Sequence, residues 1–173
     1  LQDGKQRSCN AAVTHATRYR LEHGLEPPGP DSGDYCRARQ KLNVAGVKQL
    51  ACHIAESLSH ASPDCWLWLG KRVKLVDGFT FTMPDTPDNQ EGFPQSGSQK
   101  SGIGFPITRT CVVLSLACAC IEAIAVGTYA GKNTGESALL RQVLDCFKPG
   151  EVLLADRYFC SFFMLAILKS RGI

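Results

Sequence analysis

The sequence predicts an α/β fold in which a small all-helical domain over residues 1–62 precedes a sheet-containing domain over residues 63–173. Apolar side chains recur at helical spacing before residue 60, whereas runs rich in β-branched residues dominate after residue 70. A helical pattern also separates the last such run from the run before it, and a crossover helix implies parallel strand pairing. Hydrophobic residues make up 44% of the 173 residues, so the chain can bury a core.

Three helices are expected in the N-terminal domain. Residues 9–22 form the first, with Ser8 as its N-cap and Gly24 as its stop. A Pro- and Gly-rich loop follows, and Asp34 can cap the second helix. The third helix carries an amphipathic stripe made of Val47, Leu50, Ala51, Ile54 and Leu58.

The strands of the second domain are expected in four runs. The first is residues 73–77, in which Val73, Leu75 and Asp77 share one face by the period of two. Residues 82–104 hold several prolines and glycines, which indicates a long excursion. Two β-rich runs follow, at residues 107–116 and 121–128.

The last third of the chain predicts a helix, a strand and a helix. Asn133 and Glu136 form a capping box, and residues 158–171 form the final helix. Between them, the apolar run at residues 152–155 fits a buried parallel strand. The first of these two helices should point five side chains inward: Leu139, Leu140, Val143, Leu144 and Phe147.

Composition excludes several classes of protein. The longest apolar stretch, residues 111–121, ends at Glu122 and is too short to span a membrane. Nine cysteines without a CxxC pair predict free thiols and a cytoplasmic protein. The net charge of +3 is too mild to prove a nucleic-acid partner, although residues 1–76 carry 11 basic and 7 acidic side chains. The first residue is Leu1, and both ends look cut, so we expect a piece of a longer protein.

Two aspartates follow apolar strand cores. Asp77 follows Leu75 and Val76, and Asp156 follows the run at residues 152–155. If the two strands are neighbours, the carboxylates face each other, and a hard divalent cation such as Mg²⁺ relieves their repulsion. Such an ion activates water or a hydroxyl group in phosphoryl transfer. The alternative is that either aspartate only caps a turn or the following helix.

Several separated runs carry a family resemblance: residues 35–42, Lys74-Leu75-Val76-Asp77-Gly78, residues 83–90, 98–106 and 131–136, and residues 152–159. In this order they resemble DDE transposases of bacterial insertion sequences over nearly the whole chain. The subgroup that they resemble most carries a Tyr-Arg-Glu-Lys signature near its third catalytic carboxylate.

The resemblance implies a ribonuclease-H-like catalytic core with two Mg²⁺ ions held by two aspartates and a glutamate. Asp77 matches the first aspartate, Asp156 the second, and Arg157 the basic residue after the second. The glutamate has no match up to Ile173, so it is expected outside this chain, which would be inactive alone. Phe79 departs from the family, which has a small hydroxyl residue there.

The implied activity is metal-dependent cleavage of transposon ends and their transfer to target DNA. The implied partners are the transposon-end DNA, the target DNA and a second copy of the protein in a synaptic complex. The implied location is the bacterial cytoplasm at the nucleoid, without membrane association. Basic side chains that could contact phosphate are Arg72, Lys74, Lys100, Arg109, Lys132 and Arg157, unless they are ordinary surface charges.

Two other functions remain open at this point. A truncated transposase copy could bind DNA or the full-length enzyme and act only as an inhibitor. A different ribonuclease-H-like nuclease could hydrolyse another substrate without strand transfer.

Overall fold

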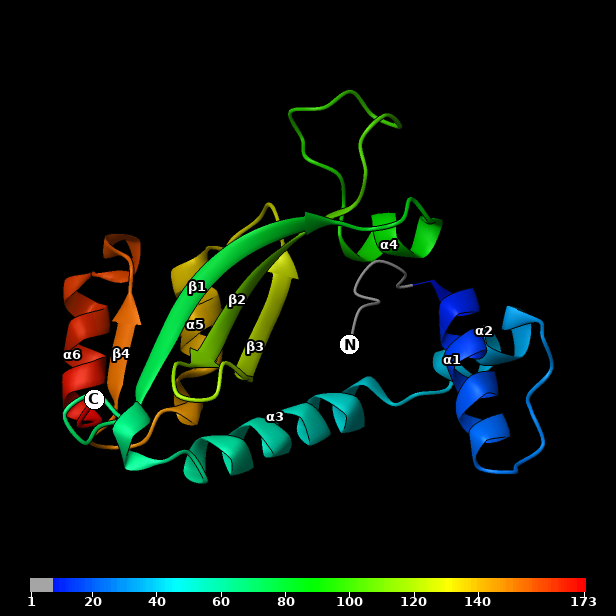
Figure 1. The fold of residues 1–173 in the computed structure, drawn as a ribbon. Helices are drawn as coiled ribbons and strands as arrows, with labels where there is room; N and C mark the ends of the chain where they lie inside the picture. Colours follow the sequence, from blue (N-terminus) through cyan, green and yellow to red (C-terminus); the bar gives the residue numbers. More distant parts are fainter. Residues whose placement is uncertain (1–7) are drawn as a thin grey trace. The chain divides into compact units, whose positions relative to one another are not determined.

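A computed structural model describes residues 8–173 and divides the chain into two units, one up to Lys48 and one from Gln49 to Ile173. The first unit contains α1 (Cys9–Glu22), α2 (Ser32–Gln40) and the beginning of α3 (Val44–His60). The second contains the rest of α3 and the whole sheet (Figure 1).

Capping residues set the first two helices. Ser8 accepts a hydrogen bond from the Ala11 amide and caps α1, as predicted. The cap of α2 is Asp31, which accepts from the Gly33 amide, so the expectation of Asp34 was wrong. Asp34 lies within the first turn and pairs with Arg37 instead. The helix therefore begins one turn earlier than the sequence suggested.

The second unit is built on a four-stranded mixed sheet in the order β3-β2-β1-β4 (Figure 1). Strand β1 (Val73–Thr82) pairs antiparallel with β2 (Ile107–Ser115), which pairs antiparallel with β3 (Ile121–Thr128). The short β4 (Val152–Ala155) pairs parallel with β1, as predicted. The expected burial was wrong, because β4 is an edge strand and Leu154 is 49% exposed. This mixed α/β architecture is compatible with a ribonuclease-H-like core.

One face of the sheet is covered by the C-terminal helices. By the period of two, Val76, Cys111, Val113, Ala123 and Ala125 point to the same face, and all five are buried. They pack against buried side chains of the later segments, namely Leu139, Leu140, Val143, Leu144, Phe147, Phe159, Met164 and Leu168. The five inward positions expected of the first C-terminal helix are therefore confirmed.

The segments around β4 differ from their predicted limits. Helix α5 (Glu136–Gln142) has Gly135 as its N-cap, and no side chain caps it, so the capping box of Asn133 and Glu136 does not form. Asn133 has φ of +61°, a left-handed conformation incompatible with that role. After α5 comes the 3₁₀ turn η2 (Leu144–Cys146), and after β4 come the turn η3 (Arg157–Phe159) and α6 (Phe162–Ser170).

The excursion between β1 and β2 contains the short helix α4 (Pro87–Gly92) and is otherwise irregular. In this segment the side-chain amide of Gln95 makes hydrogen bonds to the backbone, in place of the hydrogen bonds between strands. Its oxygen accepts from the amides of Gly102 and Gly104, and its nitrogen donates to the carbonyls of Gln99 and Lys100. The excursion is thus held by defined hydrogen bonds.

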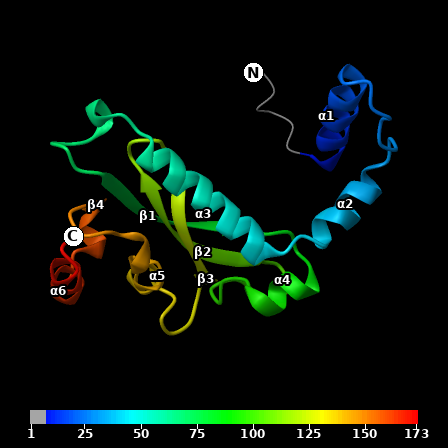
Figure 2. The ribbon, with the colours of Figure 1, turned by 90° about the horizontal axis from the view of Figure 1, so that it is seen from below.

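The stripe on α3 does not reach the core. Of its side chains, Val47, Leu50, Ile54 and Leu58 are each about half exposed, whereas Ala55 and Ser59 are buried. The Cys118 thiol contacts the Ala55 carbonyl, so the second half of α3 packs at the turn between β2 and β3 (Figure 2). Within residues 8–173 no helix combines the length and apolarity needed to span a membrane.

Candidate metal and phosphoryl-transfer site

Asp77 and Asp156 each follow the last residue pair of the β1–β4 ladder. The parallel register ends with Val76 paired with Ala155. Asp77 is the next residue within β1, which continues to Thr82, whereas Asp156 comes directly after the end of β4. Both side chains are exposed. The register therefore puts the backbones of Asp77 and Asp156 at the same end of the β1–β4 ladder.

Each carboxylate is oriented by one backbone amide. Oδ1 of Asp77 accepts from the amide of Gly78 at 2.8 Å, and Oδ1 of Asp156 accepts from the amide of Tyr158 at 2.8 Å. The second bond makes Asp156 the cap of η3. Neither aspartate forms an ion pair within residues 8–173, so their remaining oxygens suit a hard cation such as Mg²⁺.

Glu136, the first residue of α5, packs on β1 at Gly78, the residue that follows Asp77. A Cβ atom placed on Gly78 would lie 2.7 Å from Oε2 of Glu136, so the Glu136 carboxylate packs directly on the glycine that follows Asp77. The sequence analysis assigned Glu136 to a helix cap and included it in a run of the family resemblance, but it did not predict the contact with Gly78. The useful signal was Gly78 itself, a small residue inside a strand that marks a close approach.

Direct metal coordination by three side chains is not preformed. Among the described residues, no group of three or more His, Cys, Asp or Glu side chains is placed to hold a metal ion. The candidate residues on this chain are Asp77 and Asp156, and Glu136 packs on Gly78, next to Asp77 in the sequence.

The basic side chains expected at phosphates divide into two groups. Lys100, Lys132 and Arg157 are exposed. Arg109 donates to the Thr134 carbonyl at 3.4 Å and stacks on the Tyr129 ring, and Arg72 donates to the Ser59 carbonyl at 2.7 Å. Arg109 and Arg72 are thus already used within the fold.

One comparison with known proteins gives a relative. The chain is 26% identical over 129 residues to the transposase InsG for insertion sequence element IS4 of Escherichia coli strain K12. The alignment covers 75% of this chain and 28% of that transposase, so the chain spans little more than a quarter of the relative's length. No protein-family profile and no solved structure matches the chain. The similarity supports a distant relationship to insertion-sequence transposases.

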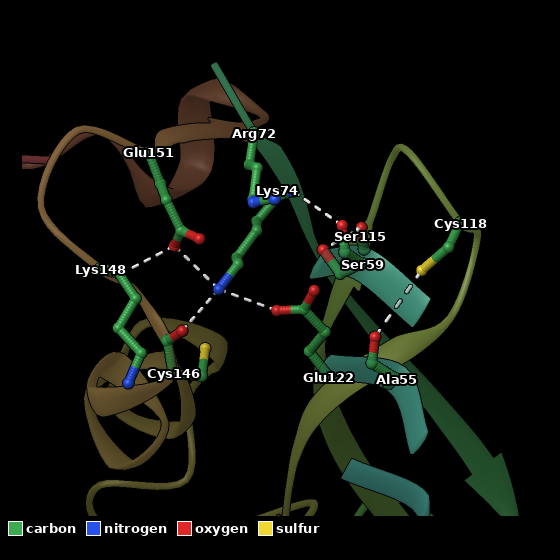
Figure 3. Close-up of polar contacts among 10 residues, drawn as sticks. All are labelled: Ala55, Ser59, Arg72, Lys74, Ser115, Cys118, Glu122, Cys146, Lys148 and Glu151. Atoms are coloured by element: carbon green, nitrogen blue, oxygen red, sulfur yellow. Dashed lines mark hydrogen bonds and ion pairs between the residues drawn. The ribbon is translucent and has the colours of Figure 1, made fainter. Parts of the chain in front are cut away.

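Lys74 is the one expected phosphate contact that the structure contradicts. Its side chain is buried, and Nζ lies 2.8 Å from carboxylate oxygens of both Glu122 and Glu151 and 2.6 Å from the Cys146 carbonyl (Figure 3). Burial by itself lowers the pKa of Lys74, but the bonds to the two glutamates outweigh it, and the pKa is raised. This lysine is charged and inaccessible to DNA.

An irregularity in β3 brings Glu122 to Lys74. Val113 pairs with Ala123 and Leu114 with Ile121, so Glu122 is an extra residue in the ladder. A bulge of this kind redirects a side chain, and here Glu122 becomes buried beside the similarly buried Ala123. A cavity of about 210 Å³ adjoins the cluster, and its walls carry both basic and acidic side chains, including Arg72, Lys148, Glu56 and Asp145.

Proposed function

We propose that this chain is the Asp-Asp-bearing part of an insertion-sequence transposase that cleaves transposon ends and joins them to target DNA. The observation that supports the proposal is the register of β1 and β4, which ends at the pair Val76 and Ala155, the residues that directly precede Asp77 and Asp156. The similarity to the IS4 transposase supports the same assignment.

Mg²⁺ suits the residues present, because both aspartates offer exposed, unpaired carboxylate oxygens. When bound, the ions would neutralise charge on the phosphate and favour deprotonation of the attacking oxygen. Asp77 and Asp156 would hold the ions, and their backbone hydrogen bonds would keep the carboxylates oriented. A glutamate from a segment following Ile173 is proposed to complete the ligand set, as the family resemblance implies.

Two in-line displacements at phosphorus make up the proposed reaction. In cleavage, a water oxygen bonds to phosphorus, the bond to the 3′-oxygen breaks, and that oxygen leaves as a hydroxyl. In strand transfer, this hydroxyl attacks a target phosphate and releases the target's own 3′-oxygen. Catalysis of this kind is mainly positioning and charge neutralisation.

DNA is the proposed partner, as both transposon end and target, with a homodimer in the synaptic complex. Such a protein would work in the bacterial cytoplasm at the nucleoid. Exposed Lys100, Lys132 and Arg157 are proposed phosphate contacts, since their charges are accessible.

The test uses the transposase that contains this chain, with Asp77→Asn and Asp156→Asn as separate variants. Each should lower Mg²⁺-dependent cleavage of a labelled transposon end by at least about a hundredfold, because a charge-stabilising group is lost. DNA affinity should be retained in both. Asp88→Asn, an exposed aspartate in α4, is the matched control and should cleave normally.

Three results would count against the proposal. Normal cleavage by Asp77→Asn or by Asp156→Asn would show that the proposed metal site is wrong. Cleavage without any joined product would favour a nuclease, and DNA binding without cleavage by the unmodified protein would favour an inhibitory copy.

A further inference from the structure

Two free cysteines meet where α1 packs on α2. Cys9 is the first residue of α1, Cys36 lies in the middle of α2, and a side-chain hydrogen bond joins the two thiols. Both side chains are partly exposed, so a small molecule in solution can reach them. Two accessible thiols that already touch are the reactants from which a disulfide forms.

Arg39 places a positive charge beside one of these sulfurs. It lies one turn after Cys36 on α2, and its Nη1 donates to Sγ of Cys9 at 3.7 Å. The hydrogen bond with Cys9 is the main cause of a raised pKa at Cys36, so Cys36 keeps its proton and donates it to the Cys9 sulfur. The Cys9 sulfur therefore accepts from two donors, one of them charged. Such an environment favours the thiolate, which is the form that attacks a disulfide.

A second pair of neighbouring cysteines has a different environment. The Cys120 thiol donates to the Cys118 carbonyl at 3.5 Å, and the Cys118 thiol contacts the Ala55 carbonyl at 3.9 Å. The pKa of Cys120 is raised, chiefly by its bond to Cys118 and also by the negative charge of Glu122. Thiols that donate to carbonyl groups beside a negative charge stay protonated, so this pair is the poorer nucleophile.

Helix α2 is held to its unit by few apolar contacts. None of its side chains is buried, and the proline-rich loop at residues 25–30 that joins it to α1 is exposed. Segments with little buried surface open at low cost in free energy. A covalent bond between Cys9 and Cys36 would therefore restrict a helix that packing stabilises only weakly.

We propose that Cys9 and Cys36 form a reversible disulfide that fastens α2 to α1, with a small disulfide such as glutathione disulfide as the oxidant. The inference does not depend on the proposed function, because neither cysteine belongs to the site of Asp77 and Asp156. Reversible disulfides that act as redox sensors are compatible with a reducing compartment.

The proposed exchange has two steps. Cys9 gives its proton to solvent, its sulfur bonds to one sulfur of glutathione disulfide, and the released glutathione thiolate takes up a proton. Cys36 then loses its proton, its sulfur bonds to the Cys9 sulfur, and the second glutathione leaves and is protonated. Two protein thiols are oxidised, and one small disulfide is reduced to two thiols.

The experiment treats the 173-residue chain with glutathione disulfide, blocks the remaining thiols with N-ethylmaleimide and identifies linked peptides by mass spectrometry. The first disulfide to form should join Cys9 to Cys36, and dithiothreitol should reverse it. Cys36→Ser should stop at a mixed disulfide of Cys9 with glutathione, because the second sulfur is missing. Cys65→Ser, which removes an exposed cysteine, is the matched control and should form the bond normally.

Arg39→Gln tests the origin of the reactivity. It should slow disulfide formation several-fold, because the Cys9 sulfur loses its charged donor. Lys41→Gln removes a positive charge at the exposed C-terminal end of α2 and should react at the rate of the unmodified chain. Equal rates for the two variants would show that Arg39 does not activate Cys9.

A second readout follows the helix itself. Trypsin cleaves after Arg37 and Arg39, and it should cut the oxidised chain there more slowly than the reduced chain, since the bond restricts α2. Cys9→Ser should be cut at one rate with and without glutathione disulfide. Three results would overturn the proposal: separate mixed disulfides on Cys9 and Cys36, a first disulfide between other cysteines, or unchanged cleavage of α2 after oxidation.

Discussion

Gly78 separates the first aspartate from the rest of β1, and its missing side chain leaves room for another residue. The Glu136 carboxylate occupies the space in which any Cβ would stand. The backbone amide of Gly78 also donates the hydrogen bond that orients the Asp77 carboxylate. One glycine thus controls the positions of two carboxylates.

Gly78→Ala should therefore destabilise the chain by about 1–3 kcal/mol, because the new methyl group overlaps the Glu136 side chain. Urea unfolding checks this. Adding Glu136→Ala to Gly78→Ala should restore most of the lost stability, since the overlapping atoms are removed.

A matched glycine is available in α4, where a Cβ on Gly92 would meet no atom within 4 Å. Gly92→Ala should be close to neutral. Equal losses at Gly78 and Gly92, or no recovery in the double variant, would contradict the packing of Glu136 on Gly78.

At the scale of elements, Arg72 joins α3 to the start of β1. Its Nη1 donates to the Ser59 carbonyl at 2.7 Å and its Nη2 to the His60 carbonyl at 3.4 Å. These carbonyls belong to the last turn of α3, where the helix leaves acceptors unpaired and where a positive charge is favourable. Arg72 is therefore a C-terminal cap for α3.

Arg72→Gln should lower the free energy of unfolding by about 1–2 kcal/mol and should not reduce the salt dependence of DNA binding. Urea unfolding and DNA titrations at several salt concentrations measure the two effects. The neighbouring Lys71→Gln is the control for stability, because Lys71 is exposed. If Arg72→Gln instead reduced the salt dependence of DNA affinity and left stability unchanged, Arg72 would be a phosphate contact and not a helix cap.

The elements themselves were largely predictable because their signals are local. Strands β2 and β3 follow from β-branched runs, and β4 from four apolar residues after a helix. Helix caps were less predictable, since Asp31 and Asp34 are both acceptable side-chain caps for α2, and α5 has Gly135 as its N-cap with no side-chain cap. The candidate pair Asp77 and Asp156 came from strand ends, whereas Glu136 depends on a contact between segments far apart in sequence.

At the scale of the molecule, several buried groups carry raised pKa values. Burial raises the pKa of Cys111 to about 11 and that of Cys146 to about 12. The Lys74 pKa is raised by its bonds to Glu122 and Glu151, against the opposing effect of burial. In all three groups the folded state holds its proton more tightly than the unfolded state does.

Between about pH 7 and pH 8.5, where unfolded thiols keep their protons, these three groups should leave stability unchanged, and stability should fall steadily from there to pH 12. The two thiols account for the first part of the decline in stability. Lys74 accounts for the part above about pH 10.4, because the unfolded lysine then loses its proton while the raised pKa in the folded state still retains it. Urea unfolding across pH 7–11 measures the curve.

Cys111→Ala and Cys146→Ala should each flatten the curve between pH 9 and 11. Cys65→Ala, at an exposed position, should not alter its shape. A free energy of unfolding that stays level from pH 8 to 11 would show that these thiols are not protected by the fold.

The pairing of β1 with β4 also has a consequence for the order of folding. β1 pairs with β2 and β2 pairs with β3, so each of these pairings joins strands that are consecutive in the chain. Val76 pairs with Ala155 only after the intervening chain has folded back. Contacts of large sequence separation close more slowly than local ones, because more chain entropy is lost first. We therefore expect the three-stranded meander to form early and β4 to dock late. Asp156 directly follows β4, so the proposed pairing of Asp77 with Asp156 would form only when β4 docks.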